Sequence, residues 1–393
     1  MSLAEDLAKL PNSGSDIKNT NTPQEWRARL DVGNEGGYFI STPRNAGELP
    51  DAVEMFKDFD LDPKVWIVVG VRKSRWQRYD GEWLEAARVS IKPATAVRHE
   101  MEIDVEKLIA EIKKWRPAKV KQSTGDLTYI SCSADEQVGK DAGGGTKEII
   151  PRIKNSVDES IARYKELLKI DRQIGQICLP QLADNIEGCV SQNGKVMTRS
   201  DLGITDQVRV SRRLLLYKIK SFAPYTGSLV VPAINGNHDE TTRFGLTNPN
   251  DSWQIDVVSQ VQDICAENPD LAHVKFRYPE NDNSTLAIDL NGTSIGFAHG
   301  HQTKGNPVKW WSGQSAGLTP VGLADVLITA HYHHYQSSDV GKRLWLQVPA
   351  MDGGSPWFRD ARGLESRAGI LTLVVGAGYD PRRDLAVLAG EAR

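Results

Sequence analysis

The stretch SLVVPAINGNHDE, residues 228–240, decides how the whole chain is interpreted. Its first half is a continuous apolar run, which is typical of a buried strand. The run ends at Asn237, His238 and Asp239, and polar or ionisable side chains in such a place cost stability unless they find partners. This cluster predicts a functional site if other strands of the chain end in matching side chains.

Four further predicted strands also lead directly into polar or ionisable side chains. The five strands are expected at residues 126–134, 174–183, 228–234, 293–299 and 325–331. Ligands of open α/β sheets bind at the carboxyl ends of the strands, so these five ends are expected to meet at one edge. The candidate metal ligands at that edge are Asp135, Gln137, Asp184, Asn237, His299, His331 and His333.

The types of these side chains indicate which ions the edge would hold. Carboxylates, a neutral amide and several imidazoles suit Mn²⁺, Fe²⁺ or Zn²⁺ better than Ca²⁺. No cysteine joins the set, which argues against a structural zinc site. A carboxylate shared by two cations holds them about 3.5–4 Å apart, the spacing used in phosphoester hydrolysis, and Asp184 is the candidate bridge.

The motifs, taken in order between residues 125 and 350, resemble the calcineurin-like metallophosphoesterase family. They are ADEQ (134–137), ADNIE (183–187), GNHD (236–239), AH (298–299) and AHYH (330–333). The corresponding family pattern is DxH, GDxxD, GNH followed by an acid, H, and GHxH. The segments ADEQVGK and ADNIEG further resemble phage-encoded members that are grouped with SbcD-type DNA repair nucleases.

The resemblance implies an α/β fold, a four-layer αββα sandwich with mixed sheets, and two divalent metal ions. Mn²⁺ is the first expectation, with Mg²⁺, Fe²⁺ or Zn²⁺ as alternatives. One ion would be held by Asp135, Gln137, Asp184 and His333, and the other by Asp184, Asn237, His299 and His331. A hydroxide between the metals would attack phosphorus. The implied catalytic residues are His238, which would protonate the leaving oxygen, Asp239, and Arg243, which would contact phosphate.

The chain departs from the family pattern at four positions. Gln137 stands where the family has histidine, so the first metal is expected to bind less tightly and to prefer Mn²⁺ or Mg²⁺. Ala183 and Ala330 replace glycines, and Glu187 replaces an aspartate. The change at Ala183 is expected to be minor.

The length of 393 residues predicts two domains, because a chain this long exceeds one ordinary hydrophobic core. The expected parts are a flexible arm at 1–21, a small α+β domain at 22–120 and the metallophosphoesterase domain at 121–393. Within the small domain, TPQEWRARL (22–30) is predicted to start a helix. The basic segment KSRWQRYDG (73–81) is predicted to contain the turn that joins two strands.

Basic and aromatic residues alternate from Arg72 through this turn, and again in KKWRPAKVK (113–121), which suits single-stranded nucleic acid. The alternative is a solvated basic turn whose tryptophans belong to the core. The first interpretation is a metal-dependent phosphodiesterase that acts as a DNA exonuclease or endonuclease. Its expected partners are DNA and an ATPase of the SbcC type, with an oligomer as a further expectation. The other interpretations are a cyclic nucleotide phosphodiesterase, a phosphoprotein phosphatase and a non-catalytic scaffold.

Composition excludes few classes of protein. The formal net charge of -3 makes any basic surface a local feature. The four cysteines form no CxxC pair, so a reducing cytoplasm is expected, that of the host if the chain is phage-encoded. No apolar run approaches the roughly 20 residues that a membrane span needs, and the first residues do not resemble a secretion signal.

Overall fold

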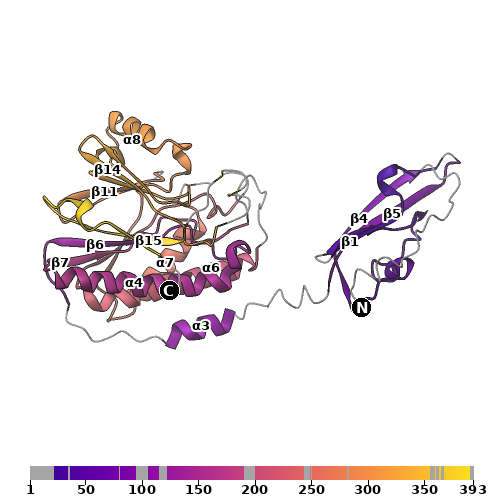
Figure 1. Cartoon of the computed structure of the whole chain (residues 1–393), viewed down its shortest axis with the longest axis horizontal. Coiled ribbons are helices and arrows are strands. Elements are labelled where there is room, and N and C mark those ends of the chain that lie inside the picture. Colours follow the sequence, from indigo (N-terminus) through magenta and orange to yellow (C-terminus); the bar gives the residue numbers. More distant parts are fainter. Residues whose placement is uncertain are drawn as a thin grey trace. The chain divides into compact units, whose positions relative to one another are not determined.

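The computed structural model describes residues 22–33, 36–78, 80–93, 105–114, 122–189, 200–242, 248, 250–280, 283–354, 359, 363 and 367–389. The chain divides into two compact units, Met1–Glu102 and Ile103–Arg393 (Figure 1). Helix α3 (Val105–Lys114), which the sequence placed in the small domain, falls within the second unit. Val105 packs against the core of that unit, and Arg209 forms an ion pair with Glu106.

The first unit is an antiparallel sheet with two short 3₁₀ helices, η1 (Gln24–Trp26) and η2 (Glu54–Phe59). The sheet order is β1-β2-β5-β3, and β4 also pairs with β5. Its strands are β1 (Arg29–Gly33), β2 (Gly36–Ile40), β3 (Arg44–Asn45), β4 (Trp66–Gln77) and β5 (Trp83–Pro93).

The helix predicted to start at residue 22 is wrong. The chain makes only the single turn η1 and enters β1 at Arg29. Leu30 and Val32 are half-buried and pack against the core of this unit, whereas the alternate residues of β1 are exposed. This alternation has the period of a strand, and burial of two aliphatic side chains outweighed the capping signal.

The basic segment is a strand and not a turn over most of its length, because β4 continues to Gln77. Successive strand residues point to opposite faces, so Arg72 lies on one face and Lys73 and Arg75 on the other. Trp76 is half-buried against the cluster that contains Trp26 and is therefore a core residue. The structure therefore agrees with the alternative in which Trp76 belongs to the core, and nucleic-acid binding by this segment stays a prediction. Tyr79 and Trp115 lie outside the described residues.

The second unit contains two mixed sheets. The six-stranded sheet has the order β16-β15-β6-β7-β8-β9, and the five-stranded sheet has the order β10-β11-β12-β14-β13. The first consists of β6 (Leu127–Cys132), β7 (Ile174–Cys178), β8 (Leu229–Pro232), β9 (Val274–Arg277), β15 (Gly369–Val375) and β16 (Ala386–Ala389). The second consists of β10 (Leu286–Leu290), β11 (Thr293–Phe297), β12 (Val326–Thr329), β13 (Gln336–Val340) and β14 (Arg343–Gln347).

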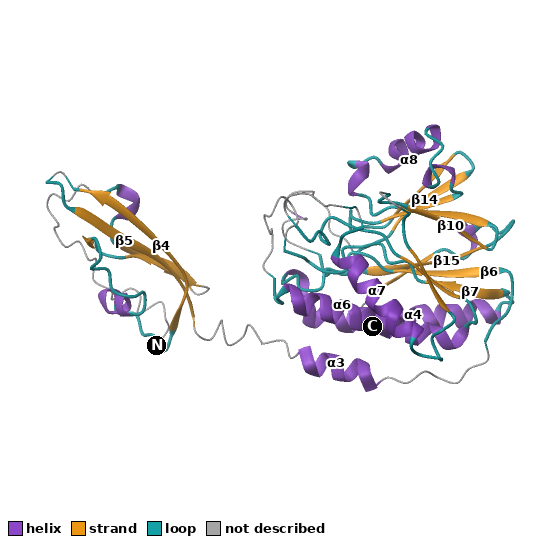
Figure 2. Ribbon diagram, turned by 180° about the vertical axis from the view of Figure 1, so that it is seen from behind, coloured by secondary structure: helices purple, strands orange, loops and turns teal. Residues whose placement is uncertain are grey.

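Helices cover the outer faces of the two sheets, which confirms the predicted four-layer αββα sandwich (Figures 1 and 2). The helices on the six-stranded sheet are α4 (Gly145–Lys169), α6 (Ile204–Phe222) and α7 (Trp253–Ala266), and α8 (Pro307–Ala316) lies on the five-stranded sheet. A buried cluster that includes Ile130 and Phe297 joins the sheets, and Trp311 packs on Leu327 under α8. Among the described residues, no helix is long and apolar enough to cross a membrane.

The parallel strands bring the predicted ligand loops to one place. β6, β7 and β8 are parallel neighbours, as are β11 and β12, so their carboxyl ends lie at the same edge of each sheet. Backbone hydrogen bonds then join the loops. Gln137 N donates to Asp184 O at 2.9 Å, and Asp352 N donates to Asp135 O at 3.2 Å. The ligand positions are therefore set by the packing of the two sheets.

Candidate metal centre

Three of the predicted ligands form a compact buried group. One donor atom each from Asp184, His299 and His331 lies within 4.8 Å of the others. His299 Nε2 is 2.8 Å from Asp184 Oδ2 and 3.9 Å from Asp135 Oδ1. His333 Nε2 is 3.7 Å from the same Asp135 oxygen. The structure thus brings five predicted side chains, from four separate loops, toward one point.

Apart from the 2.8 Å contact between His299 Nε2 and Asp184 Oδ2, several buried atoms at this point have no hydrogen-bond partner within the described part of the chain. They are Asp135 Oδ1, Asp184 Oδ2, Asn237 Oδ1 and His299 Nε2. Buried polar atoms normally have partners, so a group of orphaned donor atoms facing one another fits a metal ion. The residues therefore fit the divalent ions that the family pattern implies.

The remaining atoms of the same side chains hold them in orientation. Asp184 Oδ1 accepts a hydrogen bond from His238 N at 2.9 Å, and Asp135 Oδ2 accepts one from His331 N at 3.0 Å. His299 Nδ1 lies 2.8 Å from the carbonyl of Leu182 and donates to it, which leaves Nε2 as the metal-binding atom. Asp135, Asp184 and His299 are thus each oriented by a backbone group.

Charge within the group favours replacement of a proton by a metal. Burial raises the pKa of Asp184, but the neighbouring His299 and His238 lower it by more, so it lies well below its ordinary value. Burial lowers the pKa of His299, yet Asp184 raises it to about 10. Burial and the nearby His299 lower the pKa of His331 to about 3. A divalent cation held by Asp184 and His299 would take the place of the His299 proton.

The backbone is strained at these loops. Among the described residues eleven that are not glycine have a positive φ, and six of them belong to the motifs. These are Asp135 (49°), Gln137 (43°), Ala183 (75°), Asp184 (51°), His331 (73°) and His333 (63°). Such conformations cost about 1–3 kcal/mol each and cluster at functional sites. The replacement of glycine by Ala183 is therefore not minor, because Ala183 needs the backbone that glycine adopts freely.

Gly236 is required by close packing. A Cβ atom built on Gly236 would lie 1.9 Å from Asp184 Oδ1. The loop of the GNHD motif therefore passes directly over the candidate bridging carboxylate, and only glycine allows that approach.

His238 lies beside the ligand group and is mostly buried. Its Nδ1 is 2.8 Å from the carbonyl of Glu187, and its Nε2 is 3.4 Å from Gln137 Nε2. Asp239 lies beneath it, where Oδ2 accepts hydrogen bonds from Asp184 N at 2.8 Å and from Gly236 N at 3.3 Å. This geometry gives Asp239 the role of fixing the loop. Arg243 lies outside the described residues.

Sequence reasoning missed two charged residues at the site, Lys140 and Asp352. Both are buried and form an ion pair, and Asp352 Oδ2 is also 3.2 Å from His333 Nδ1. The Lys140 ammonium donates to Gln137 Oε1 at 2.6 Å. Asp352 follows β14, so the rule that strand ends carry site residues applies to it as well. The PAMDGG segment that contains it matches no ligand motif.

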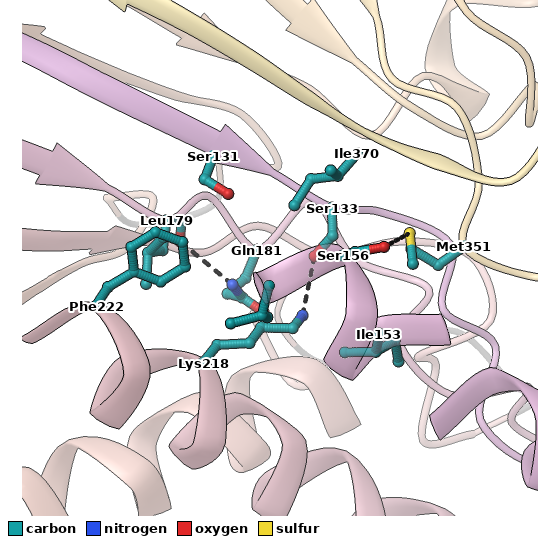
Figure 3. A pocket seen from close by; sticks show the side chains of 11 residues that line it. Ser131, Ser133, Ile153, Ser156, Leu179, Gln181, Lys218, Phe222, Met351 and Ile370 are labelled. Atoms are coloured by element: carbon teal, nitrogen blue, oxygen red, sulfur yellow. Dashed lines mark hydrogen bonds between the residues drawn. The ribbon is translucent and has the colours of Figure 1, made fainter. Parts of the chain in front are cut away.

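A second buried lysine supports the loops from below. Lys218, on α6, forms an ion pair with Glu136 and donates to Ser133 Oγ at 2.9 Å (Figure 3). A small cavity opens beside it, between the six-stranded sheet and the helices. Its lining includes Ser131, Ser156, Gln181, Phe222 and Met351. The residues that line it include none of the candidate metal ligands, so this cavity is separate from the metal centre.

Comparison with known proteins adds only general likeness. No family model matches the chain, and no curated protein matches it. A mutant of Vps29 from Entamoeba histolytica is similar at 13% identity and a TM-score of 0.31, over 63% of this chain and 86% of that one. An archaeal phosphodiesterase is 14% identical with a TM-score of 0.30, over 66% of this chain and 99% of that one. A predicted phosphoesterase from Streptococcus pneumoniae is 12% identical with a TM-score of 0.27, over 63% of this chain and 83% of that one. At these values the neighbours carry no argument about the site.

Proposed function

We propose that this chain is a metal-dependent phosphoester hydrolase. The observation that carries the proposal is the group of orphaned, buried donor atoms from Asp135, Asp184 and His299 beside a fixed imidazole, His238. Bound divalent metals supply activation of water and neutralisation of phosphate charge. A non-catalytic scaffold would not need carboxylates and imidazoles that are held in fixed orientations toward one point.

His238 has the position of a proton donor. Its Nδ1–H donates to the Glu187 carbonyl, so the ring cannot turn away and Nε2 remains the atom that carries or gives up a proton. A proton delivered from Nε2 to the leaving oxygen is worth typically about 10²–10⁴-fold in rate. His238 would do this without binding a metal itself.

The proposal is tested with bis-p-nitrophenyl phosphate, a phosphodiester with no sequence or shape to recognise. The protein is stripped with EDTA, dialysed, and assayed with and without Mn²⁺, Mg²⁺ and Zn²⁺. We expect no hydrolysis after chelation and recovery with added metal, best with Mn²⁺. Full activity in EDTA would refute the metal-dependent mechanism.

The natural substrate class that we propose is nucleic acid, with DNA first. Support comes from one cross-strand row on the sheet of the first unit, in which Arg29 faces Ile40, Ile40 faces Arg88 and Arg88 faces Arg72. Directly opposed residues project from the same face of a sheet, so three arginines share one face over about 14 Å. We call these residues, Arg29, Arg72 and Arg88, the arginine row.

The arginine row is built to present positive charge. All three arginines are exposed, and like charges directly opposite each other destabilise a sheet unless an anion lies over them. The Arg88 guanidinium stacks 3.7 Å from the centre of the Tyr38 ring, and Arg29 donates to the Tyr38 hydroxyl at 2.9 Å. Planar guanidinium groups fixed in this way suit the phosphates of a nucleic acid strand.

The matched test uses two double variants of the full chain that remove the same charge from opposite faces. Arg72→Gln with Arg88→Gln should weaken binding to single-stranded DNA. The slope of log affinity against log salt concentration should become shallower by the amount expected for about two lost phosphate contacts. Lys73→Gln with Arg75→Gln should change both much less. Both should still hydrolyse bis-p-nitrophenyl phosphate. Equal losses in the two variants would overturn the assignment of the arginine row. An ATPase partner of the SbcC type and a role in DNA repair stay predictions.

A further inference from the structure

The amide of Gln137 lies between two charged or ionisable groups. On one side the Lys140 ammonium lies 2.6 Å from Gln137 Oε1, and on the other His238 Nε2 lies 3.4 Å from Gln137 Nε2. Gln137 is 2% exposed, so water does not compete for either contact. The family pattern would instead direct this residue at a metal ion.

The ammonium decides which way the Gln137 amide faces. A protonated lysine has only donors, so the atom opposite Lys140 must be the amide oxygen. The NH₂ group then faces His238, whose Nε2 accepts when the ring is neutral, which is its state after a proton has left Nε2. The His238 tautomer agrees with this, because its other nitrogen, Nδ1, already donates to the Glu187 carbonyl at 2.8 Å. The donors therefore run in one direction from Lys140 through Gln137 to His238.

Lys140 is itself held firmly. Its side chain is 6% exposed and that of Asp352 is fully buried, and the two form an ion pair. Backbone bonds fix Asp352 beside the first motif, since Asp352 N donates to Asp135 O. A buried ammonium with a paired carboxylate cannot leave its position without exposing an unpaired charge, which is costly. The oxygen of Gln137 is thus bound to a cation that the protein itself supplies.

We infer that Gln137 is a positioning residue and not a metal ligand. The amide oxygen of Gln137, its only metal-binding atom, is occupied by Lys140, and the amide NH₂ group of Gln137 holds the His238 ring. The inference rests on the proposed function and makes it more specific. Oxygen is the one atom through which a glutamine binds a hard cation, and a metal ion next to the same oxygen would be repelled by the ammonium. The first metal position is left with three candidate protein ligands, Asp135, Asp184 and His333.

The two metal positions are therefore unequal. The second keeps the full set of Asp184, Asn237, His299 and His331, whereas the first lacks a fourth side chain. We expect calorimetric titration of the stripped protein with Mn²⁺ to resolve one tight and one weaker event. Two events of equal affinity would contradict this inference.

The decisive variant is Gln137→Met, which has similar volume but no amide. We expect both Mn²⁺ affinities to stay within about two-fold of the parent, because no ligand is lost. His333→Ala is the matched control and should weaken the weaker of the two Mn²⁺-binding events, that of the first metal position, by at least the 10–100-fold typical of damage to a metal site. If Gln137→Met loses metal as His333→Ala does, Gln137 is a ligand and the inference is wrong.

The positioning role has its own readout. In protein labelled with ¹⁵N at histidine, loss of the amide donor in Gln137→Met should move the Nε2 resonance of His238, and turnover should fall while metal content holds. An unmoved His238 resonance would also overturn the inference. If instead the parent protein binds metal as described but hydrolyses no phosphoester, the proposed function fails while the assignment of Gln137 stands.

The complementary variant adds the ligand that the family pattern has. Gln137→His together with Lys140→Met removes the competing ammonium and supplies an imidazole, so the weaker Mn²⁺ event should tighten by about 10-fold or more. A melting curve shows whether this double variant remains folded. If it does not fold, the test rests on Gln137→Met, which keeps the ion pair between Lys140 and Asp352. An unchanged weaker event in a folded double variant would contradict the role given to Lys140.

Discussion

The substitution Gly236→Ala tests whether the GNHD loop holds the bridging carboxylate. The added methyl would lie 1.9 Å from Asp184 Oδ1, whereas ordinary contact begins at 3.4 Å, so one of the two groups must move by about 1.5 Å. Metal ligands tolerate displacements of only about 0.2 Å. The same shift breaks the 2.9 Å hydrogen bond from His238 N to Asp184 Oδ1, worth about 1.5–3 kcal/mol for a charged acceptor.

We therefore expect Gly236→Ala to lower Mn²⁺ affinity by at least about 100-fold, with hydrolysis of bis-p-nitrophenyl phosphate lost in parallel. Metal content by mass spectrometry and calorimetric titration are the measurements, and a melting curve reports on folding. Gly313→Ala is the control, because nothing lies within 4 Å of its added methyl, and an alanine in helix α8 should stabilise the protein slightly. Metal content and affinity close to the parent in Gly236→Ala would refute the close approach.

Further variants separate the roles of the site and of the surrounding fold. His238→Ala should reduce turnover by about 10²-fold or more with metal content unchanged, and loss of metal would show that it is a ligand. Asp184→Ala should lose metal and activity together. Burial raises the pKa of Asp384, but hydrogen bonds from Arg172 and Tyr379 lower it by more, to below 3.8. Its contribution to stability is therefore present above that pH and lost as pH falls below it, so Asp384→Asn should flatten the acid limb of a melting-temperature profile; an unchanged limb would contradict this.

Much of the metal centre was predictable because its signal is local. An apolar run that ends in ionisable residues occurs wherever a buried strand enters a site, and that rule alone led to Asp135, Asp184 and His299. The α/β class followed from the alternation of strands and helices between residues 126 and 268, whereas the four-layer order came only from the family resemblance. The positions of these side chains depend on the strand that precedes them and need no knowledge of distant contacts.

The features that sequence reasoning missed depend on contacts between distant segments. β15 inserts between β16 and β6, although about 240 residues separate it from β6, and no local pattern announces that pairing. Asp352 reaches Lys140 from more than 200 positions away. The arginine row likewise exists only once β1, β2, β4 and β5 are in register. Because Asp352 fixes Lys140, the Lys140 ammonium donates to Gln137, which the sequence had suggested as a metal ligand.

The placement of charge gives a physical reason for the departure from the family pattern at Gln137. Asn237, His299 and His331 are the candidate ligands of the second position, where Asp184 and His299 lie 2.8 Å apart. Loss of His299 would leave the buried Asp184 carboxylate without its charged neighbour, at a cost of several kcal/mol. At the first position the buried charges of Lys140 and Asp352 neutralise each other, and they need no metal ion to do so. A cation supplied by the chain makes the histidine at position 137 dispensable. The glutamine there can then hold the ring that delivers the proton.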